Sequence, residues 1–147
     1  MLQIIWLAWY FLPEAQELAG RVADRRVGAA VRQEDPLYRW LLTLAPLIPP
    51  QSTYVFVDNY EAGKEIEARY HLTPRRHILL SPEAPPSFLF NALRQEKAAF
   101  LLLREGDKPW ASREAVQESP AFHRLPVPGP GLVYRVDYPK LLGRFYD

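Results

Sequence analysis

Apolar residues occur in short blocks that polar turns and prolines separate. Three of these blocks, 53–57, 77–80 and 98–103, are apolar at successive positions, without the alternation of a half-exposed strand. Such runs are typical of strands buried on both faces, as in a parallel sheet covered by helices. Residues 122–127 predict a short edge strand and residues 132–136 a final strand, with a tight Gly-Pro-Gly loop before the latter.

Two helices are predicted before the first strand. The first runs from Pro13 to Val31, where apolar residues recur at helical spacing. For the second, Asp35 followed by Pro36 is a typical N-cap with proline at the first helical position. Pro46 ends that helix, and its apolar stripe consists of Leu37, Trp40, Leu41 and Leu44.

Further helices are predicted between and after the strands. Residues 61–71 predict one that turns Ile66 and Tyr70 inward, with Ala62 as a further inward position. Residues 88–96 predict another with Ser87 as its cap, a short helix starts at Ser112, and residues 138–146 form a tail or short helix. Strands that alternate with helices predict an α/β fold, a Rossmann-like three-layer sandwich with a mostly parallel sheet of about four to five strands.

Length and composition agree with one such domain. The 147 residues suit a single compact domain, which we place at residues 13–147. Lys and Arg number 18 and Asp and Glu 17, so no overall field attracts nucleic acid. The chain has no cysteine, which excludes disulfides and zinc–thiolate sites.

The run Met1–Leu12 is almost wholly apolar. A spanning helix needs roughly 20 such residues, so this run is too short to cross a bilayer alone. No Lys or Arg precedes it, and no small-residue cleavage site follows, which argues against a signal peptide. Three interpretations remain: the last turns of a transmembrane helix, a buried core helix, or an interfacial helix with Trp6, Trp9 and Tyr10 at headgroup depth.

Polar residues follow the predicted strands at their carboxyl ends, where ligands bind in open α/β sheets. The candidate ligand-binding residues are Asp58, Asn59, Ser81 and Arg104. Asp58 has a second interpretation, as a cap of the helix that follows it. The turn after the first strand contains neither GxGxxG nor GxxxxGK[ST], so no nucleotide cofactor is expected.

Other polar residues do not form a recognisable catalytic set. His71 and His77 are six residues apart with a proline between them, which is not a metal-ligand spacing, and no metal is expected. Arg75 and Arg76 precede a strand, opposite the usual ligand edge, and are expected to form salt bridges to Glu65 or Glu67. No GxSxG motif is present, so no catalytic residue is assigned.

Three segments carry a family resemblance. The segment 69–78, RYHLTPRRHI, contains a YxLxPRR pattern formed by Tyr70, Pro74, Arg75 and Arg76. A strand that ends in Asp58 and the terminal strand 132–136 accompany it. Together they resemble the soluble C-terminal domains of bacterial multi-pass membrane proteins of the glycosyltransferase type that use lipid-phosphate sugar donors. Thr73 stands where that family usually has an aromatic residue.

The resemblance implies a non-catalytic role. The catalytic acids of that family lie in its membrane portion, so this chain is expected to be a non-catalytic accessory domain at the bacterial inner membrane, facing the periplasm. Its expected partners are the membrane portion of the same polypeptide and a lipid-linked sugar or acceptor, with neither nucleic acid nor metal. Two alternatives remain: a free-standing cytosolic α/β module that binds a ligand or protein, and a small enzyme that uses Asp58.

Overall fold

The computed structural model describes residues 32–59 and 64–141, together with residues 12, 15, 16, 19, 20, 22 and 23. The chain divides into one unit of residues 1–35 and another of residues 36–147. In the first unit the described residues 12–23 are helical, and the rest of the predicted helix Pro13–Val31 lies outside the description, as does most of Met1–Leu12. No helix among the described residues is long and apolar enough to cross a membrane.

The second unit is an α/β domain in which helices and strands alternate. Its strands are β1 (Thr53–Val57), β2 (Arg76–Leu80), β3 (Phe100–Arg104), β4 (Phe122–Leu125) and β5 (Gly131–Val136). Its helices are α3 (Pro36–Leu44), α4 (Lys64–His71), α5 (Pro86–Gln95) and α6 (Arg113–Glu118), followed by the 3-10 turn η1 (Tyr138–Lys140). The α/β class predicted from the alternation is therefore confirmed.

The five strands form one mixed sheet in the order β2-β1-β3-β5-β4. β1 lies parallel to both β2 and β3, whereas β5 is antiparallel to β3 and to β4. The prediction of a mostly parallel sheet was wrong for the last two strands. Only residues 126–130 join β4 to β5, and so short a connection permits a hairpin but no crossover to a parallel partner.

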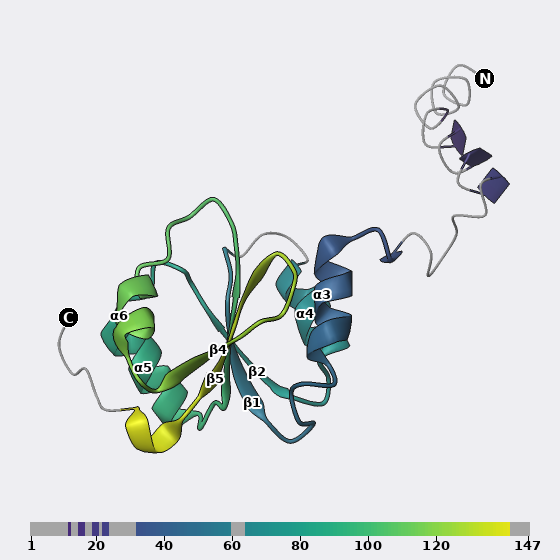
Figure 1. Cartoon of the computed structure of the whole chain (residues 1–147). Helices are drawn as coiled ribbons and strands as arrows, with labels where there is room; N and C mark the ends of the chain where they lie inside the picture. The colour runs from purple at the N-terminus through teal and green to yellow at the C-terminus, as the bar shows by residue number, and fades with distance from the viewer. Residues whose placement is uncertain are drawn as a thin grey trace, which may run out of the picture. The chain divides into compact units, whose positions relative to one another are not determined.

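Helices cover both faces of the sheet (Figure 1). On one face α5 and α6 pack against β1, β3 and β5 through Val55, Leu101 and Tyr134, among others. On the other face α3 and α4 pack against alternate residues of the same strands, such as Phe56 and Leu102. The unbroken apolar runs of β1 and β3 thus reflect burial on both sides.

The predicted inward stripe of α3 is confirmed, but that of α4 was wrong. Leu37, Trp40, Leu41 and Leu44 are all buried. On α4, Ile66 is 57% exposed and Tyr70 is 72% exposed, while Ala68 and the following Leu72 are fully buried. Ala62 lies outside the described residues. α4 buries its short Ala face against the sheet, and hydropathy alone does not favour that face over the one with Ile and Tyr.

Two glycines in the β4–β5 connection allow Trp40 to pack closely. Trp40 is 1% exposed. A Cβ on Gly131 would lie 2.8 Å from Cη2 of Trp40 and would also collide with the carbonyl oxygen of Leu103. Gly129 has φ of +155° and its Cβ would overlap the five-membered ring of Trp40. The Gly-Pro-Gly sequence therefore holds the hairpin against α3.

We expect Gly131→Ala to lower the free energy of unfolding by about 2–3 kcal/mol, because backbone and a buried indole both have to move. Gly20→Ala is the control, since no atom of the described residues lies within 4 Å of a Cβ built there, and we expect it to be neutral or slightly stabilising. Urea denaturation followed by circular dichroism measures both. Equal midpoints for the two variants would contradict the packing argument.

Candidate functional site at the carboxyl edge of β1 and β3

The parallel strands β1 and β3 bring two candidate residues together. Val57 pairs with Leu103 in the parallel register, so the next residues, Asp58 and Arg104, lie side by side. The chain leaves β1 through α4 on one face and leaves β3 through α6 on the other. β1 and β3 thus flank a topological switch point, the usual place for a ligand in an open α/β sheet.

Asp58 and Arg104 form a buried ion pair. Oδ1 of Asp58 lies 2.8 Å from Nε of Arg104 and 2.7 Å from Nη2. The same oxygen accepts the backbone N–H of Asn59 at 2.7 Å. The side chains are 1% and 12% exposed, respectively. Oδ2 of Asp58 is buried and has no hydrogen-bond partner among the described residues, so half of this carboxylate retains its capacity to accept a donor.

Asn59 lies against the loop after β3. A Cβ built on Gly106 would collide with the side-chain amide of Asn59. The amide therefore needs a glycine at position 106 to approach so closely. This contact joins the segments that follow β1 and β3, and Asn59 belongs with Asp58 and Arg104 in one cluster.

Ser81 is not drawn into this cluster. Its hydroxyl accepts the backbone N–H of Glu83 at 3.3 Å, which organises the turn after β2. No described contact joins Ser81 to Asp58 or Arg104. The carboxyl ends of β1 and β3 meet at the switch point, whereas β2 lies on the far side of β1.

A pocket of about 320 Å³ opens beside Arg104. Its walls come from the ends of β2 and β3 and from the segment that leads into α6; they are Pro82, Leu103, Arg104, Glu105, Gly106, Lys108, Trp110 and Arg113. Lys108 lies 3.1 Å from Glu83 in an exposed pair. Of the pocket residues, Arg104 alone was a candidate from the sequence. Trp110 and Arg113 were missed because nothing in the sequence shows that the segment leading into α6 lies beside the end of β3.

The cap interpretation of Asp58 stays a prediction. α4 is described from Lys64, and residues 60–63, which include the predicted helix start, lie outside the description. The described contacts of the Asp58 side chain go to Asn59 and Arg104, while its backbone N–H donates to Leu80. The described part of the chain contains no group of three His, Asp or Glu side chains that could hold a metal ion.

The YxLxPRR segment lies at the opposite edge of the sheet and has structural contacts. Nε of Arg75 donates to the carbonyl oxygen of Ile48 at 2.6 Å, Nη1 donates to that of Leu72 at 3.2 Å, and Nη2 donates to that of Ala45. These carbonyls follow the ends of α3 and α4. One guanidinium therefore caps the negative ends of two helix dipoles.

The partners predicted for the arginine pair were wrong. Arg76 lies 2.6 Å from Glu96, after the end of α5, and not beside Glu65 or Glu67. Arg75 bonds backbone oxygens rather than a carboxylate. The acids of α4 pair instead with other residues: Glu67 with Lys64, and Glu65 with Arg69 and His77.

Glu65 instead belongs to a buried polar network with His77 and Tyr54. Nδ1 of His77 lies 2.8 Å from the Tyr54 hydroxyl, and Nε2 lies 3.2 Å from Oε1 of Glu65, without good hydrogen-bond geometry. The carboxylate favours a proton on Nε2, so we assign Tyr54 as the donor to Nδ1. Burial lowers the pKa of His77, against the opposing effect of Glu65, and burial raises the pKa of Tyr54 well above its usual range.

We expect this network to make stability depend on pH. A histidine whose pKa is lower in the folded protein contributes fully above the unfolded value of roughly 6.5 and loses that contribution as the pH falls through the folded pKa. Stability should therefore drop below about pH 6.5, and His77→Gln should reduce this drop. Thermal melts between pH 7.5 and 5 measure this loss of stability. His123 is exposed, so His123→Gln is the control, and it should lose stability with falling pH as the unaltered protein does. A His77→Gln profile as steep as that of the unaltered protein would disprove the assignment.

Comparison with protein-family models, curated proteins and solved structures found no match. The geometry of the cluster and its pocket is thus the basis for a functional assignment. The charged groups of Arg104, Lys108, Arg113 and Glu105 line a small cavity, and Arg104 joins this cavity to the buried carboxylate of Asp58, which is not itself a wall residue. Such a site is suited to orienting a polar ligand.

Proposed function

We propose that this protein is a non-catalytic binding module, the accessory domain of a membrane protein, and that it binds a small polar ligand or an acceptor group at the carboxyl edge of β1 and β3. The observation that carries the binding role is the buried carboxylate of Asp58. Arg104 holds one of its oxygens and also lines a pocket at the switch point of the sheet, whereas the other oxygen is buried and has no partner among the described residues.

The ion pair supports binding because of its energetic cost. Burying two charges at this edge is expensive, and well-packed apolar residues of similar volume are often as stable. Perturbed or incompletely satisfied charged groups in a cleft are candidates for a functional site. Arg104 would orient Asp58 so that its second oxygen receives a ligand donor.

Attachment to a membrane has separate support. It rests on the apolar run Met1–Leu12 and on the resemblance of the segments around Tyr70, Pro74, Arg75 and Arg76 to periplasmic domains of glycosyltransferase-type membrane proteins. A free-standing cytosolic module with the same binding edge is the alternative. The accessory domain and the cytosolic module differ in where the protein is located in the cell, and both use the same binding site.

NMR of the full chain, labelled with ¹⁵N, tests binding. The probe is the low-molecular-weight fraction of a bacterial cell extract. We expect amide shifts to concentrate at Asn59, Arg104 and Gly106 and at the indole of Trp110. Arg113→Gln should weaken them, whereas Arg135→Gln, at the other end of the sheet, should not. Shifts that are absent, or that avoid these residues, would refute the binding site.

Cell fractionation tests location. An epitope-tagged protein, expressed from its complete gene, should sediment with inner membranes and become sensitive to external protease in spheroplasts. Recovery in the soluble cytosolic fraction would reject the accessory-domain proposal and favour the cytosolic module.

A further inference from the structure

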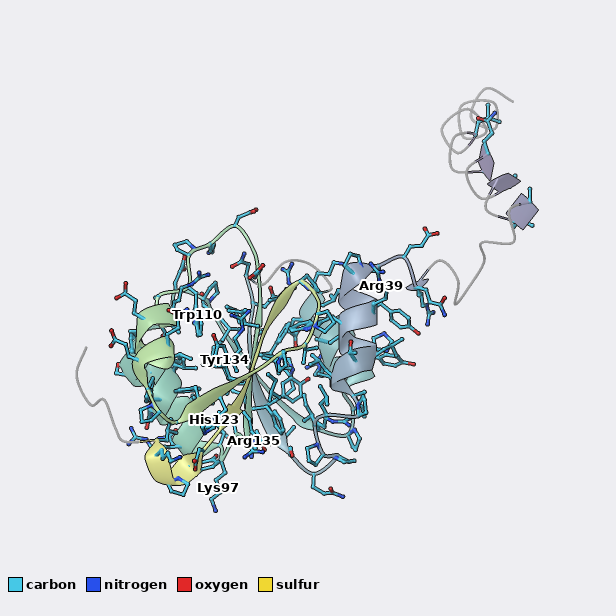
Figure 2. All side chains as sticks on the ribbon, viewed as in Figure 1. Arg39, Lys97, Trp110, His123, Tyr134 and Arg135 are labelled. Atoms are coloured by element: carbon cyan, nitrogen blue, oxygen red, sulfur yellow. The ribbon has the colours of Figure 1, made fainter. Side chains whose placement is uncertain are left out.

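A second pocket lies beside the first half of α3, away from the cavity at Trp110. Its volume is about 450 Å³, within the range of about 300–1,000 Å³ usual for small-ligand sites. The walls combine rigid apolar surface with a few polar groups: they include Pro36, Pro128 and Pro130, together with Arg39, Trp40 and Thr43. Figure 2 shows Arg39 on α3, and the register of β5 places Arg135 at the opposite end of the sheet.

Two hydrogen-bond donors at this pocket have no acceptor within the described part of the chain. Nε1 of Trp40 is buried and unpartnered there. Arg39 is exposed, and no described carboxylate lies within ion-pair distance of it. Thr43 already donates its hydroxyl proton to the carbonyl oxygen of Arg39 at 2.8 Å, so its oxygen can only accept.

The indole nitrogen lies along the edge of the ring that faces the glycine-containing loop. Cδ1, which is bonded to Nε1, is adjacent to Gly129. On the other side Nε1 is bonded to Cε2, and the next ring carbon, Cζ2, is adjacent to Gly131. A buried N–H without a partner is destabilising. Because Nε1 is buried, a ligand acceptor reaches it only if residues 128–130 move, and it would then satisfy this donor.

We propose that this pocket binds a small organic carboxylate with an apolar body. The carboxylate would accept hydrogen bonds from the Arg39 guanidinium and from Nε1 of Trp40, and the apolar body would lie against the prolines. Among the described residues of the pocket wall, Arg39 alone is charged, and its charge is complementary to an anion. The two pockets share no wall residue, although the N–H of Glu105 donates to the carbonyl oxygen of Pro130 between them; the carboxylate proposal does not rest on the proposed function.

Titration of the full chain with phenylacetate tests the proposal. The readout is the ¹H–¹⁵N cross-peak of the Trp40 indole, which is identified by its loss in Trp40→Phe. We expect phenylacetate to shift this peak, while the neutral isostere phenylacetamide does not. Arg39→Gln should weaken binding roughly tenfold, the effect of removing one charge-assisted contact, and Arg135→Gln should leave it unchanged.

Trp40→Phe separates binding from folding. It keeps an aromatic ring against Gly129 and Gly131 but removes the unpartnered N–H, so the fold should persist while phenylacetate binding, followed by the amide peak of Gly129, weakens. An unshifted indole peak at millimolar phenylacetate overturns the proposal. Equal binding of phenylacetamide also overturns it, since the site would then not select an anion.

Discussion

Replacing Arg104 with methionine should lower the free energy of unfolding by about 3–5 kcal/mol. The change leaves Asp58 as a buried carboxylate that has lost its cation, and removing one partner of a buried ion pair typically costs this much. Asp58 is 1% exposed and depends on Arg104 for two of its contacts. Chemical denaturation at pH 7 measures the loss.

A double variant tests whether the lost stability comes from leaving the Asp58 charge unpaired or from losing the ion pair itself. Asp58→Leu combined with Arg104→Met removes both charges, and we expect it to recover most of the stability because apolar replacements of buried pairs are often neutral. The double variant should nevertheless lose ligand binding at this edge. A single-variant cost below about 1 kcal/mol, the value of an exposed pair, would show that water reaches Asp58.

Arg75→Ala should destabilise the protein by about 3 kcal/mol or more. Hydrogen bonds to a charged group contribute about 1.5–3 kcal/mol each, although contributions that share one side chain are not additive. Arg75 makes three such bonds, to the backbone oxygens of Ala45, Ile48 and Leu72. Its loss leaves the ends of α3 and α4 without these donors.

Arg76 provides a matched control for this prediction, since it is the adjacent residue and carries the same side chain. Its pair with Glu96 is partly exposed, with side-chain exposures of 63% and 30%, so Arg76→Ala should cost less than about 1 kcal/mol. Arg75→Lys should retain part of the stability, because one ammonium cannot reproduce three fork-directed bonds. Equal thermal shifts for the two alanine variants would contradict the role of Arg75 as a double helix cap.

The contacts of Arg75 also give a physical meaning to the YxLxPRR pattern. Its first arginine fixes two helix ends, its second forms a surface pair, and Tyr70 is exposed. Within the described part of the chain, these contacts give the segment a structural role.

Local patterns predicted which segments form strands and helices. Unbroken apolar runs such as Val55–Val57 require burial on both faces, and prolines lie at or near the starts and ends of elements, as Pro36 and Pro46 do around α3, so these features depend on near neighbours alone. The inward stripe of α3 follows from the same kind of local periodicity. The juxtaposition of Asp58 and Arg104 was also within reach, because residues that follow adjacent parallel strands must meet at one edge.

Local patterns left some alternatives open, such as which face a helix buries or in which direction a strand runs, and only the tertiary structure decided between them. Whether α4 buried Ala68 or Tyr70 was decided by the space left beside the sheet, and the direction of β5 was decided by its short link to β4. The partners of Arg75 and the unpaired donor of Trp40 likewise arise from segments far apart in the chain. Hydropathy and spacing determine which secondary structure each segment forms, because both depend on near neighbours. Long-range packing determines which segments lie next to one another. At the carboxyl edge, that packing brings Asp58 and Arg104 together as a candidate site.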